Sequence, residues 1–257
     1  MPEDLNTKIG KFYDASSRLW EETWGEHMHH GHYGDNGRLK KDDQQAQVDL
    51  IEELLTWGNI RNADKILDIG CGIGGSALYL AEKFGAQVTG ITLSAYQCQR
   101  ATERAAEANL SKTVLFEVAD ALNPPYDKGS FDLLWSLESG EHIPEKERLM
   151  QVCADMLQPG GRLLMAVWCR RSIPPPLSKN EGKLLGRLYH AYHLPPMISI
   201  QEYAELARQA GFTQIKIDDW TAAVSRFWWA VIRSALSFKN VAGIVKAGKL
   251  TINGAMA

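Results

Sequence analysis

Short apolar runs alternate with helix-like patterns through the middle of the chain, between residues 65 and 169. Runs of strand length and composition predict five β-strands, at 65–70, 87–92, 113–120, 131–139 and 161–169. Helical spacing fills the intervening stretches at roughly 75–84, 94–109 and 144–157, and Gly160 with Gly161 is expected to close the last helix. Strands alternating with helices in this way predict an α/β fold with a Rossmann-like, doubly wound and mainly parallel sheet.

The segments on either side of this core have a different pattern. The first 45 residues or so are rich in Trp, His and Glu with only a short helical pattern, which favours an N-terminal arm or lid. Three prolines at 174–176 interrupt regular structure, because they suit neither a helix interior nor a central strand. Beyond them the pattern predicts helices at 180–193, 199–210 and within 222–250, and a strand at 213–220. We expect one domain over residues 1–257, with a core at 60–170 and a substrate lid and C-terminal segment at 171–257.

Composition restricts the class of protein. With 257 residues, 45% of them hydrophobic, the chain can bury one sizeable core. A net charge of -3 does not suggest nucleic acid as a partner, so a small molecule is expected. The four cysteines lack paired spacing, and the N-terminus lacks the pattern of a secretory signal or transit peptide. These features favour a cytoplasmic protein, or a plastid protein in its mature form.

A glycine-rich turn lies between the first predicted strand and the next helix, in the segment "ILDIGCGIGG". Gly70, Gly72 and Gly75 have the GxGxxG spacing of a dinucleotide site, in which helix-start N–H groups bind phosphate. A nicotinamide dinucleotide also needs an acidic residue near the end of the second strand, and "VTGITLSAYQCQ" contains none. The dinucleotide interpretation therefore lacks its second contact.

Two acidic residues favour S-adenosylmethionine instead. Asp68, two residues before the first glycine, would repel a pyrophosphate but suits the ammonium of a methionine moiety. Asp120 follows the third predicted strand, where its carboxylate can accept a hydrogen bond from an adenine amino group and the Ala121 backbone can complete the contact. The alternative role for Asp120 is to cap a helix.

The motifs "LDIGCGIGG", "VTGITLS", "VADAL", "FDLLWSLESGEHIP" and "LQPGGRLL" resemble, in this order, those of class I S-adenosylmethionine-dependent methyltransferases. The "GITLS" variant resembles the branch that methylates small molecules and lipids. For that branch the resemblance implies ribose contacts from Thr92 and Gln97, with Gln99 as a rival for the second. The remaining implied cofactor contacts lie in the glycine-rich turn, at Gly70, Cys71, Gly72 and Gly74.

Nearly the whole chain is similar to gamma-tocopherol methyltransferases, through "FYDASSRLWEETWGEHMHHGHYG", "WSLESGEHIP", "AVWCRR" and "AYHLPP". The resemblance implies C-methylation of the ring of a tocopherol-like chromanol. Prenyl-quinols and alkaloid amines are alternative acceptors, since relatives with these motifs use them, and a cofactor-binding protein without turnover is the non-enzyme alternative. Family members continue past "TINGAMA" into a final strand, so the resemblance also implies a shortened end.

Candidate catalytic residues follow the fourth predicted strand, at the edge where such sheets bind ligands. Methyl transfer to a phenol ring carbon benefits from a general base that removes the hydroxyl proton. His142 has an ordinary pKa in a useful range, Glu141 could orient it, and Glu138 could contact substrate. The alternative is that the "EHIP" segment caps the next helix, with His142 packed on Pro144.

The N-terminal arm contains four histidines, whose type suits zinc or nickel: His27, His29, His30 and His32. No cysteine or carboxylate at a recognisable metal-site spacing accompanies them, so no metal is expected. The resemblance implies instead that the arm covers the cofactor. Its implied contacts are His29 and His30 to substrate, Tyr13 and Tyr33 to cofactor, and Trp24 in an apolar pocket for an aromatic acceptor.

The last 37 residues, Thr221 to Ala257, carry five basic and no acidic residues among several large rings. Basic residues interleaved with aromatic ones suit a helix that lies at a membrane surface. The residues concerned are Arg226, Phe227, Trp228, Trp229, Arg233, Phe238, Lys239, Lys246 and Lys249. A peripheral membrane contact is therefore expected; the alternative is that the rings pack on the core.

Overall fold

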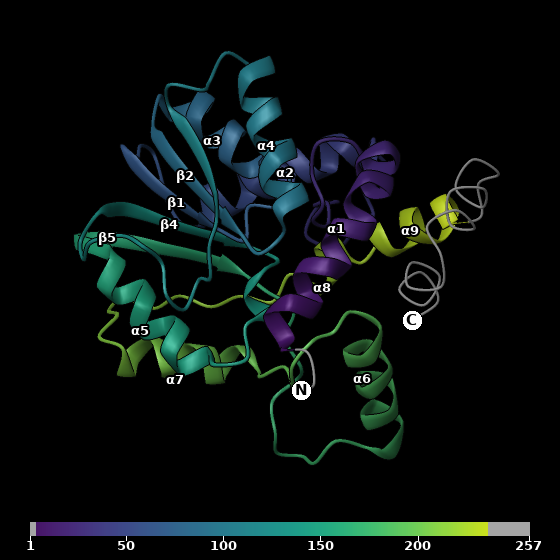
Figure 1. The fold of residues 1–257 in the computed structure, drawn as a ribbon. Coiled ribbons are helices and arrows are strands. Elements are labelled where there is room, and N and C mark those ends of the chain that lie inside the picture. The colour runs from purple at the N-terminus through teal and green to yellow at the C-terminus, as the bar shows by residue number, and fades with distance from the viewer. Residues whose placement is uncertain (1–3, 236–257) are drawn as a thin grey trace.

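A computed structural model of the protein describes residues 4–235. Its centre is a five-stranded, all-parallel sheet in the order β3-β2-β1-β4-β5, which confirms the predicted fold class (Figure 1). The strands are β1 Lys65–Ile69, β2 Gln87–Thr92, β3 Val114–Val118, β4 Phe131–Leu137 and β5 Leu157–Ala166. Strand order reverses at β1, which pairs with both β2 and β4, so the carboxyl ends on either side of β1 border a crevice that can bind a ligand.

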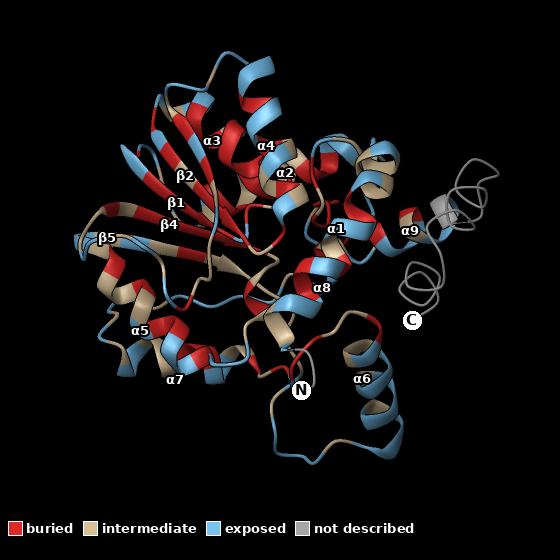
Figure 2. Cartoon of the chain, viewed as in Figure 1, coloured by how far each residue is buried: buried red, intermediate tan, exposed pale blue. Residues whose placement is uncertain are grey.

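Buried residues run along the strands and the helices that flank them (Figure 2), and apolar residues form a core cluster on each face of the sheet, as a parallel sheet flanked by helices requires. Alternate residues of β4 separate the two faces: Leu133 packs towards α2, α3 and α4, whereas Leu134 packs towards α5 and α7. These helices are α2 Asp43–Trp57, α3 Gly75–Phe84, α4 Ala95–Glu107, α5 Lys146–Met156 and α7 Ile200–Gln209.

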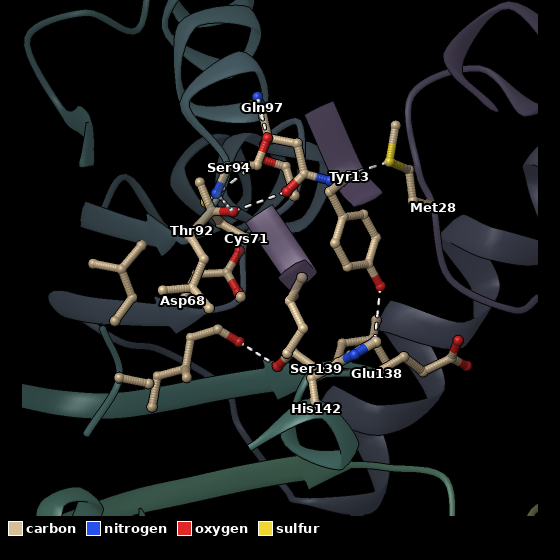
Figure 3. A pocket seen from close by; sticks show the side chains of 18 of the residues that line it. Tyr13, Met28, Asp68, Cys71, Thr92, Ser94, Gln97, Glu138, Ser139 and His142 are labelled. Carbon is tan, nitrogen blue, oxygen red and sulfur yellow. Dashed lines mark hydrogen bonds between the residues drawn. The ribbon is translucent and has the colours of Figure 1, made fainter. Parts of the chain in front are cut away.

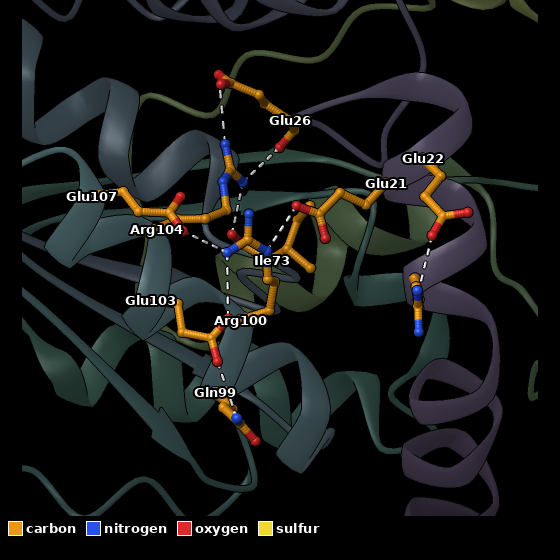
Figure 4. A network of polar contacts seen from close by, with 10 residues as sticks. Glu21, Glu22, Glu26, Ile73, Gln99, Arg100, Glu103, Arg104 and Glu107 are labelled. Carbon is orange, nitrogen blue, oxygen red and sulfur yellow. Dashed lines mark hydrogen bonds and ion pairs between the residues drawn. The ribbon is translucent and has the colours of Figure 1, made fainter.

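The N-terminal segment begins with a helix of 20 residues, α1 Leu5–Trp24, followed by an irregular arm that leads to α2. The sequence predicts only a short helical pattern here, because much of the inward face of α1 is polar. Asp14 accepts a hydrogen bond from Ser94, and Glu21 pairs with Arg100 at 2.8 Å. The arm continues this contact at Arg104, whose guanidinium donates to the backbone of the arm and of the glycine-rich turn (Figure 4). Polar contacts with α4 therefore hold the arm on the core.

The predicted start of the fifth strand is wrong, and so is the role predicted for the two glycines before it. Gly160 and Gly161 do not close α5: the helix ends at Met156, and β5 begins directly at Leu157. The register between β4 and β5 shifts between Phe131 and Leu133, and the two glycines lie in this irregularity, with Gly160 at a φ of +83°. Glycine tolerates this left-handed conformation, so the pair serves a bulge rather than a helix end. The helix α2 was not predicted at all.

The predicted strand at 213–220 does not form. This segment has no regular secondary structure, no strand pairs with it within the described residues, and Ile217 is exposed. An alternating pattern cannot make a strand without a hydrogen-bonded neighbour.

The remaining helices are α6 Lys179–Ala191, α8 Thr221–Val224 and α9 Phe227–Ala235. The rest of the helical stretch expected at 222–250 lies outside the described residues. None of the helices in the described part of the chain is long and apolar enough to span a bilayer.

The central strand β4 provides a test of this architecture. Leu134 is fully buried on β4, whereas Leu115 on β3 is 55% exposed. We expect Leu134→Ala to lower the free energy of unfolding by about 2–5 kcal/mol, the range for a buried Leu-to-Ala change. The matched change Leu115→Ala should stay within about 0.5 kcal/mol of the parent, as exposed positions do. Urea unfolding followed by circular dichroism measures both, and equal effects would contradict the assigned burial.

Candidate functional site

A pocket opens at the carboxyl ends of the central strands and is covered by α1 and the arm (Figure 3). Its empty volume, including the open mouth, is about 1090 Å³, which is large enough for a small-molecule site. The pocket joins residues far apart in the sequence. Most of the residues predicted for the site line it: Tyr13, His29, Asp68, Gly70, Cys71, Gly72, Thr92, Gln97, Asp120, Ala121, Glu138 and His142.

The glycine-rich turn brings the chain close to the end of β4. Gly70 has a φ of +80°, and a Cβ there would lie 2.2 Å from Cβ of Ser139. The N–H groups of Gly70 and Cys71 donate to the Ile91 carbonyl, which ties the turn to β2. Gly74 is at the N-terminus of α3, where a Cβ would lie 2.6 Å from the Phe116 ring, and it does not line the pocket. Its predicted role is therefore better explained by packing.

Asp68 is a buried carboxylate that lacks a full set of partners. The residue is 2% exposed, and its Oδ2 has no hydrogen-bond partner among residues 4–235. Burial raises the pKa of Asp68 to about 7, against a lowering hydrogen bond from the Ala77 backbone. A buried carboxylate with an unsatisfied oxygen is costly unless a cation joins it. The ammonium group of S-adenosylmethionine fits this position.

Thr92 and Gln97 meet at the next strand end. The Thr92 hydroxyl donates to Oε1 of Gln97 at 2.8 Å, and Nε2 of Gln97 donates to the Ser17 hydroxyl on α1 at 3.0 Å. The rival Gln99 is exposed and pairs with Glu103 on the surface of α4. The structure therefore brings Gln97, and not Gln99, to the pocket.

Asp120 lines the pocket and also bonds to the turn that follows β3, where no helix forms. Its Oδ1 accepts a hydrogen bond from the Leu122 N–H at 2.9 Å, so it caps the turn after β3. Its Oδ2 accepts from the side-chain amide of Asn6 at 3.3 Å, which connects the start of α1 to this edge of the pocket. Ala121 lines the pocket beside it.

Glu138 lies at the end of β4 with a φ of +54°, a conformation that non-glycine residues rarely adopt and that concentrates at functional sites. His30 holds its carboxylate: Nδ1 donates to Oε2 at 2.7 Å, and the backbone N–H lies 3.2 Å from each oxygen. Burial alone would raise the pKa of Glu138, but His30 and His29 lower it below its usual value. Glu138 is therefore an ionised group at the pocket wall.

His142 ends the short 3₁₀ helix η1, Gly140–His142, which follows β4. The Tyr13 hydroxyl lies 2.8 Å from its Nε2. Burial lowers the pKa of His142 to about 3 and raises that of Tyr13 above its usual value. A neutral imidazole next to a protonated phenol means that Tyr13 donates to the ring nitrogen. Figure 3 shows this pair on the opposite side of the pocket from Asp68.

Several predicted residues lie outside the pocket lining. Tyr33 is fully buried against Ala46 and Phe227, and its hydroxyl donates to Asp43 at 2.6 Å. The cofactor contact predicted for Tyr33 is thus corrected to a packing role, because its hydroxyl already has a partner on α2. Trp24 stacks on Trp20 with ring centroids 5.9 Å apart, in the layer of rings behind the pocket.

His30 and Glu141 do not line the pocket but lie next to residues that do. His30 reaches the pocket through Glu138 and is enclosed by rings of Trp168, Phe227 and Trp228. Glu141 is 2% exposed, and burial raises its pKa to about 8. Neither residue lines the cavity, so both are better placed to orient groups that do.

Some pocket residues had no signal in the sequence. Ser139 donates from its hydroxyl to the Ile69 carbonyl, and Met28 of the arm lies 3.8 Å from the Gln97 amide. Asn6, Ile143 and Pro144 also line the cavity. Their positions follow from the way α1 and η1 cross the sheet edge, which no local pattern reveals.

The arm histidines are buried rather than arranged around an ion. The rings of His27 and His29 are 5.1 Å apart, and burial lowers the pKa of both, that of His27 to about 2. In the part of the chain that the structure describes, no group of three or more His, Cys, Asp or Glu residues could hold a metal ion.

Asp68 gives the site a specific pH dependence. Its pKa is raised to about 7 in the free protein, and a bound ammonium favours the ionised form. Below pH 7 binding must therefore expel a proton, and affinity for S-adenosylmethionine should weaken by up to about tenfold per pH unit towards pH 5. Asp68→Asn should lose about 1.5–3 kcal/mol of affinity at pH 8 and bind with little pH dependence.

Calorimetry between pH 5 and 8 measures this effect, with Asp127→Asn as the control because Asp127 is exposed outside the pocket. Affinity of the parent protein that does not change over this range, or a folded Asp68→Asn variant with parental affinity, would contradict the assignment.

Comparison with known proteins agrees with this geometry. A family model described as a methyltransferase domain matches residues 66–161, from β1 into β5. The chain is 43% identical to a probable chloroplastic tocopherol O-methyltransferase of Oryza sativa subsp. japonica over 99% of this chain and 73% of that one. It is 40% identical to the chloroplastic tocopherol O-methyltransferase of Arabidopsis thaliana over 99% and 76%. Among solved structures, the [4+2]-cyclase SpnF matches with a TM-score of 0.83 at 26% identity, over 99% of this chain and 90% of that one. The chain belongs to the tocopherol methyltransferase family of class I S-adenosylmethionine-dependent methyltransferases.

Proposed function

We propose that this chain methylates the aromatic ring of a tocopherol-type chromanol. The observation that carries the proposal is the Tyr13–His142 pair, which faces the same pocket as Asp68 and can take up a phenolic hydroxyl. The names of the two plant relatives support an acceptor of this kind. The same names mark those proteins as chloroplastic, which supports a plastid location for the reaction.

The residues of one half of the pocket bind the donor. S-adenosylmethionine, when bound, supplies an electrophilic methyl group on its sulfonium. Asp68 binds the ammonium group of the methionine moiety, and the glycine-rich turn receives its carboxylate. Thr92 and Gln97 would contact the ribose, and Asp120 would accept a hydrogen bond from the adenine amino group. Holding both reactants in one geometry supplies much of the rate enhancement in such transfers.

The residues of the other half bind the acceptor and form a hydrogen-bond path for its hydroxyl proton. The phenolic hydroxyl donates to the Tyr13 oxygen, and Tyr13 donates to Nε2 of His142, which burial keeps neutral. This hydrogen-bond path draws the phenolic proton away from its oxygen as the methyl group is transferred, which increases electron density at the ring carbon beside the oxygen. Burial disfavours a free imidazolium at His142, so proton movement and methyl transfer occur together. That carbon forms the bond to the methyl group as the sulfur–carbon bond breaks. The ring carbon then loses its hydrogen, the oxygen regains a proton, and one proton is released overall.

Reaction at carbon rather than oxygen follows from the same contacts. The acceptor's hydroxyl donates to the Tyr13 oxygen, so the Tyr13–His142 pair fixes the acceptor oxygen at its own side of the pocket, away from the methyl group. The adjacent ring carbon has increased electron density and is not held by a hydrogen bond, so it is free to face the methyl group. We therefore propose carbon as the methylated atom, although the relatives' names refer to oxygen.

A methyl-labelled donor assay tests this function with three acceptors: gamma-tocopherol, its methyl ether, and an indole alkaloid amine. Label should enter gamma-tocopherol, and the product should keep its phenolic hydroxyl, as shown by proton NMR. The methyl ether, which has no hydroxyl proton, should not react. Label in the amine alone, or a product that has lost its hydroxyl, would overturn the proposal.

His142 and Tyr13 can be tested separately from donor binding. His142→Ala should lower kcat by about 100-fold or more and leave S-adenosylmethionine affinity nearly intact, because it removes the proton acceptor. Tyr13→Phe keeps the ring but removes the hydroxyl, so it should also lower kcat. His190→Ala, at an exposed position on α6, is the control. A loss below about threefold at saturating acceptor would assign the base elsewhere.

We further propose that α9 contacts a membrane surface, from which an apolar acceptor could be taken up. Trp229 is 67% exposed and Ile232 48% exposed on this helix. Basic residues without acidic ones, as in the sequence from Thr221 onwards, complement anionic lipid. Phe227, which the sequence analysis assigned to this surface, is instead buried against the core. Arg233 is partly neutralised by Asp43 at 3.2 Å, so the exposed rings are the main contribution of the described residues.

Sedimentation with vesicles tests this surface. The protein should bind phosphatidylglycerol vesicles at low salt, and more weakly at high salt or with phosphatidylcholine, because screening reduces attraction between exposed charges. Trp229→Ala should reduce binding, whereas Leu184→Ala, which changes another exposed apolar residue on α6, should not. An active protein that binds neither vesicle would contradict the membrane contact.

A further inference from the structure

A buried lysine lies next to η1, the short helix that carries His142 to the pocket. Lys146 is the first residue of α5 and is 4% exposed. Its Nζ donates to the carbonyl oxygen of Gly140 at 2.7 Å and to that of Glu141 at 2.9 Å. Both acceptors belong to η1, the three-residue helix that ends at His142. Lys146 does not line the pocket, so the chemistry described above makes no direct use of it.

The position of this lysine is electrostatically unfavourable by itself. Helix N-termini carry partial positive charge, so a cation in the first turn of α5 is repelled. Burial adds a desolvation cost, and it lowers the pKa of Lys146 to about 8. The two carbonyl contacts with η1 offset these costs. They give the Glu141 oxygen a donor and add a second, shorter bond to the Gly140 oxygen, which also accepts from the Ile143 N–H at 3.2 Å.

The other contacts of η1 include one close packing contact and longer hydrogen bonds to the Gly140 oxygen. A Cβ on Gly140 would lie 2.8 Å from Cγ1 of Val167, so η1 packs closely against the end of β5. The Tyr203 hydroxyl on α7 approaches the Gly140 oxygen at 3.4 Å, a long contact beside that of Lys146. Lys146 therefore provides the short hydrogen bonds that fix the end of η1.

Charged and titratable groups surround both ends of this connection. Around Lys146 these are Glu141 on η1, Cys169 after β5 and Tyr203 on α7. Those facing His142 are Tyr13 on α1, His193 after α6, and Lys146 itself. The positive charge of Lys146 acts together with burial to keep His142 neutral.

We propose that Lys146 is a positioning residue, which holds the backbone of η1 so that Nε2 of His142 meets the Tyr13 hydroxyl. The inference rests on the proposed role of His142 in removing the acceptor's proton. Without the lysine, the carbonyl oxygens of Gly140 and Glu141 would lose buried donors. The end of η1 would then shift, and the imidazole with it.

The test is Lys146→Met, which keeps much of the apolar stem but removes the donors and the charge. We expect kcat to fall by about 10-fold or more, while S-adenosylmethionine affinity stays within about twofold, because the donor half of the pocket is unchanged. Lys146→Arg, which retains a cationic donor, should recover part of the loss. Lys128→Met is the matched control, because its side chain is 77% exposed and pairs only with Asp155 in the described residues.

A second readout separates positioning from a loss of stability. Nitrogen-15 NMR of the histidine rings should show the His142 signal displaced in Lys146→Met and unchanged in Lys128→Met. A folded Lys146→Met variant with parental kcat and an unmoved His142 signal would overturn the proposal. If Lys146→Met does not fold, kcat and the His142 signal are measured in Lys146→Gln instead, and the same results support or overturn the proposal.

The two proposals can fail separately. In a His142→Ala background, Lys146→Met should cause little further loss of kcat, because the lysine acts through the histidine. Full additivity of the two losses would reject the positioning role. If His142→Ala alone retains activity, the assigned base is wrong, and the NMR signal still reports whether Lys146 positions the ring.

Discussion

All five strands of the sheet run in one direction, and this constraint brings the chemical groups of the site together. Their carboxyl ends meet at one edge, and the reversal of order beside β1 opens a crevice there. Asp68 lies in the middle of this arrangement, in register with Gly90 on β2 and Trp135 on β4. Neighbours on both sides remove water from its carboxyl group, so the fold leaves a buried carboxyl, with one oxygen unpaired among the described residues, where we propose that a cationic ligand group binds.

The acceptor side of the site, at Tyr13 and His142, depends on contacts that hold α1 over the carboxyl edge of the sheet. α1 lies over the pocket because polar residues along it bond to α4, from Asp14 to Glu21. One of these contacts joins Ser17 to Gln97, a residue assigned to the donor. The same helix carries Tyr13, which meets His142 at the acceptor side. A single covering helix thus connects the residues proposed for the two binding halves, so we expect donor binding to affect the placement of the acceptor's hydroxyl.

Local patterns in the sequence predicted the features that depend on local chemistry. The first strand, Asp68 and the glycine-rich turn belong to one continuous βα unit, so the sequence predicted where they lie. Their spacing also fitted a dinucleotide site, and the lack of an acidic residue in "VTGITLSAYQCQ" favoured S-adenosylmethionine. Which of Gln97 and Gln99 reaches the pocket depends on how α4 is oriented, and only the folded structure shows that orientation. Tyr33 was misassigned because its partner lies on an unpredicted helix. Lys146 had no sequence signal, since a lysine at a helix start has the pattern of an ordinary surface residue.

The central claim is that one pocket holds the donor at Asp68 and a phenolic acceptor at the Tyr13–His142 pair. A crystal structure with S-adenosylhomocysteine and gamma-tocopherol tests it most directly. The account predicts the ammonium group within hydrogen-bond distance of Asp68, and the chromanol hydroxyl within hydrogen-bond distance of the Tyr13 oxygen, with the adjacent ring carbon facing the sulfur. An acceptor hydroxyl directed away from both Tyr13 and His142, or an ammonium group bound elsewhere, would contradict it.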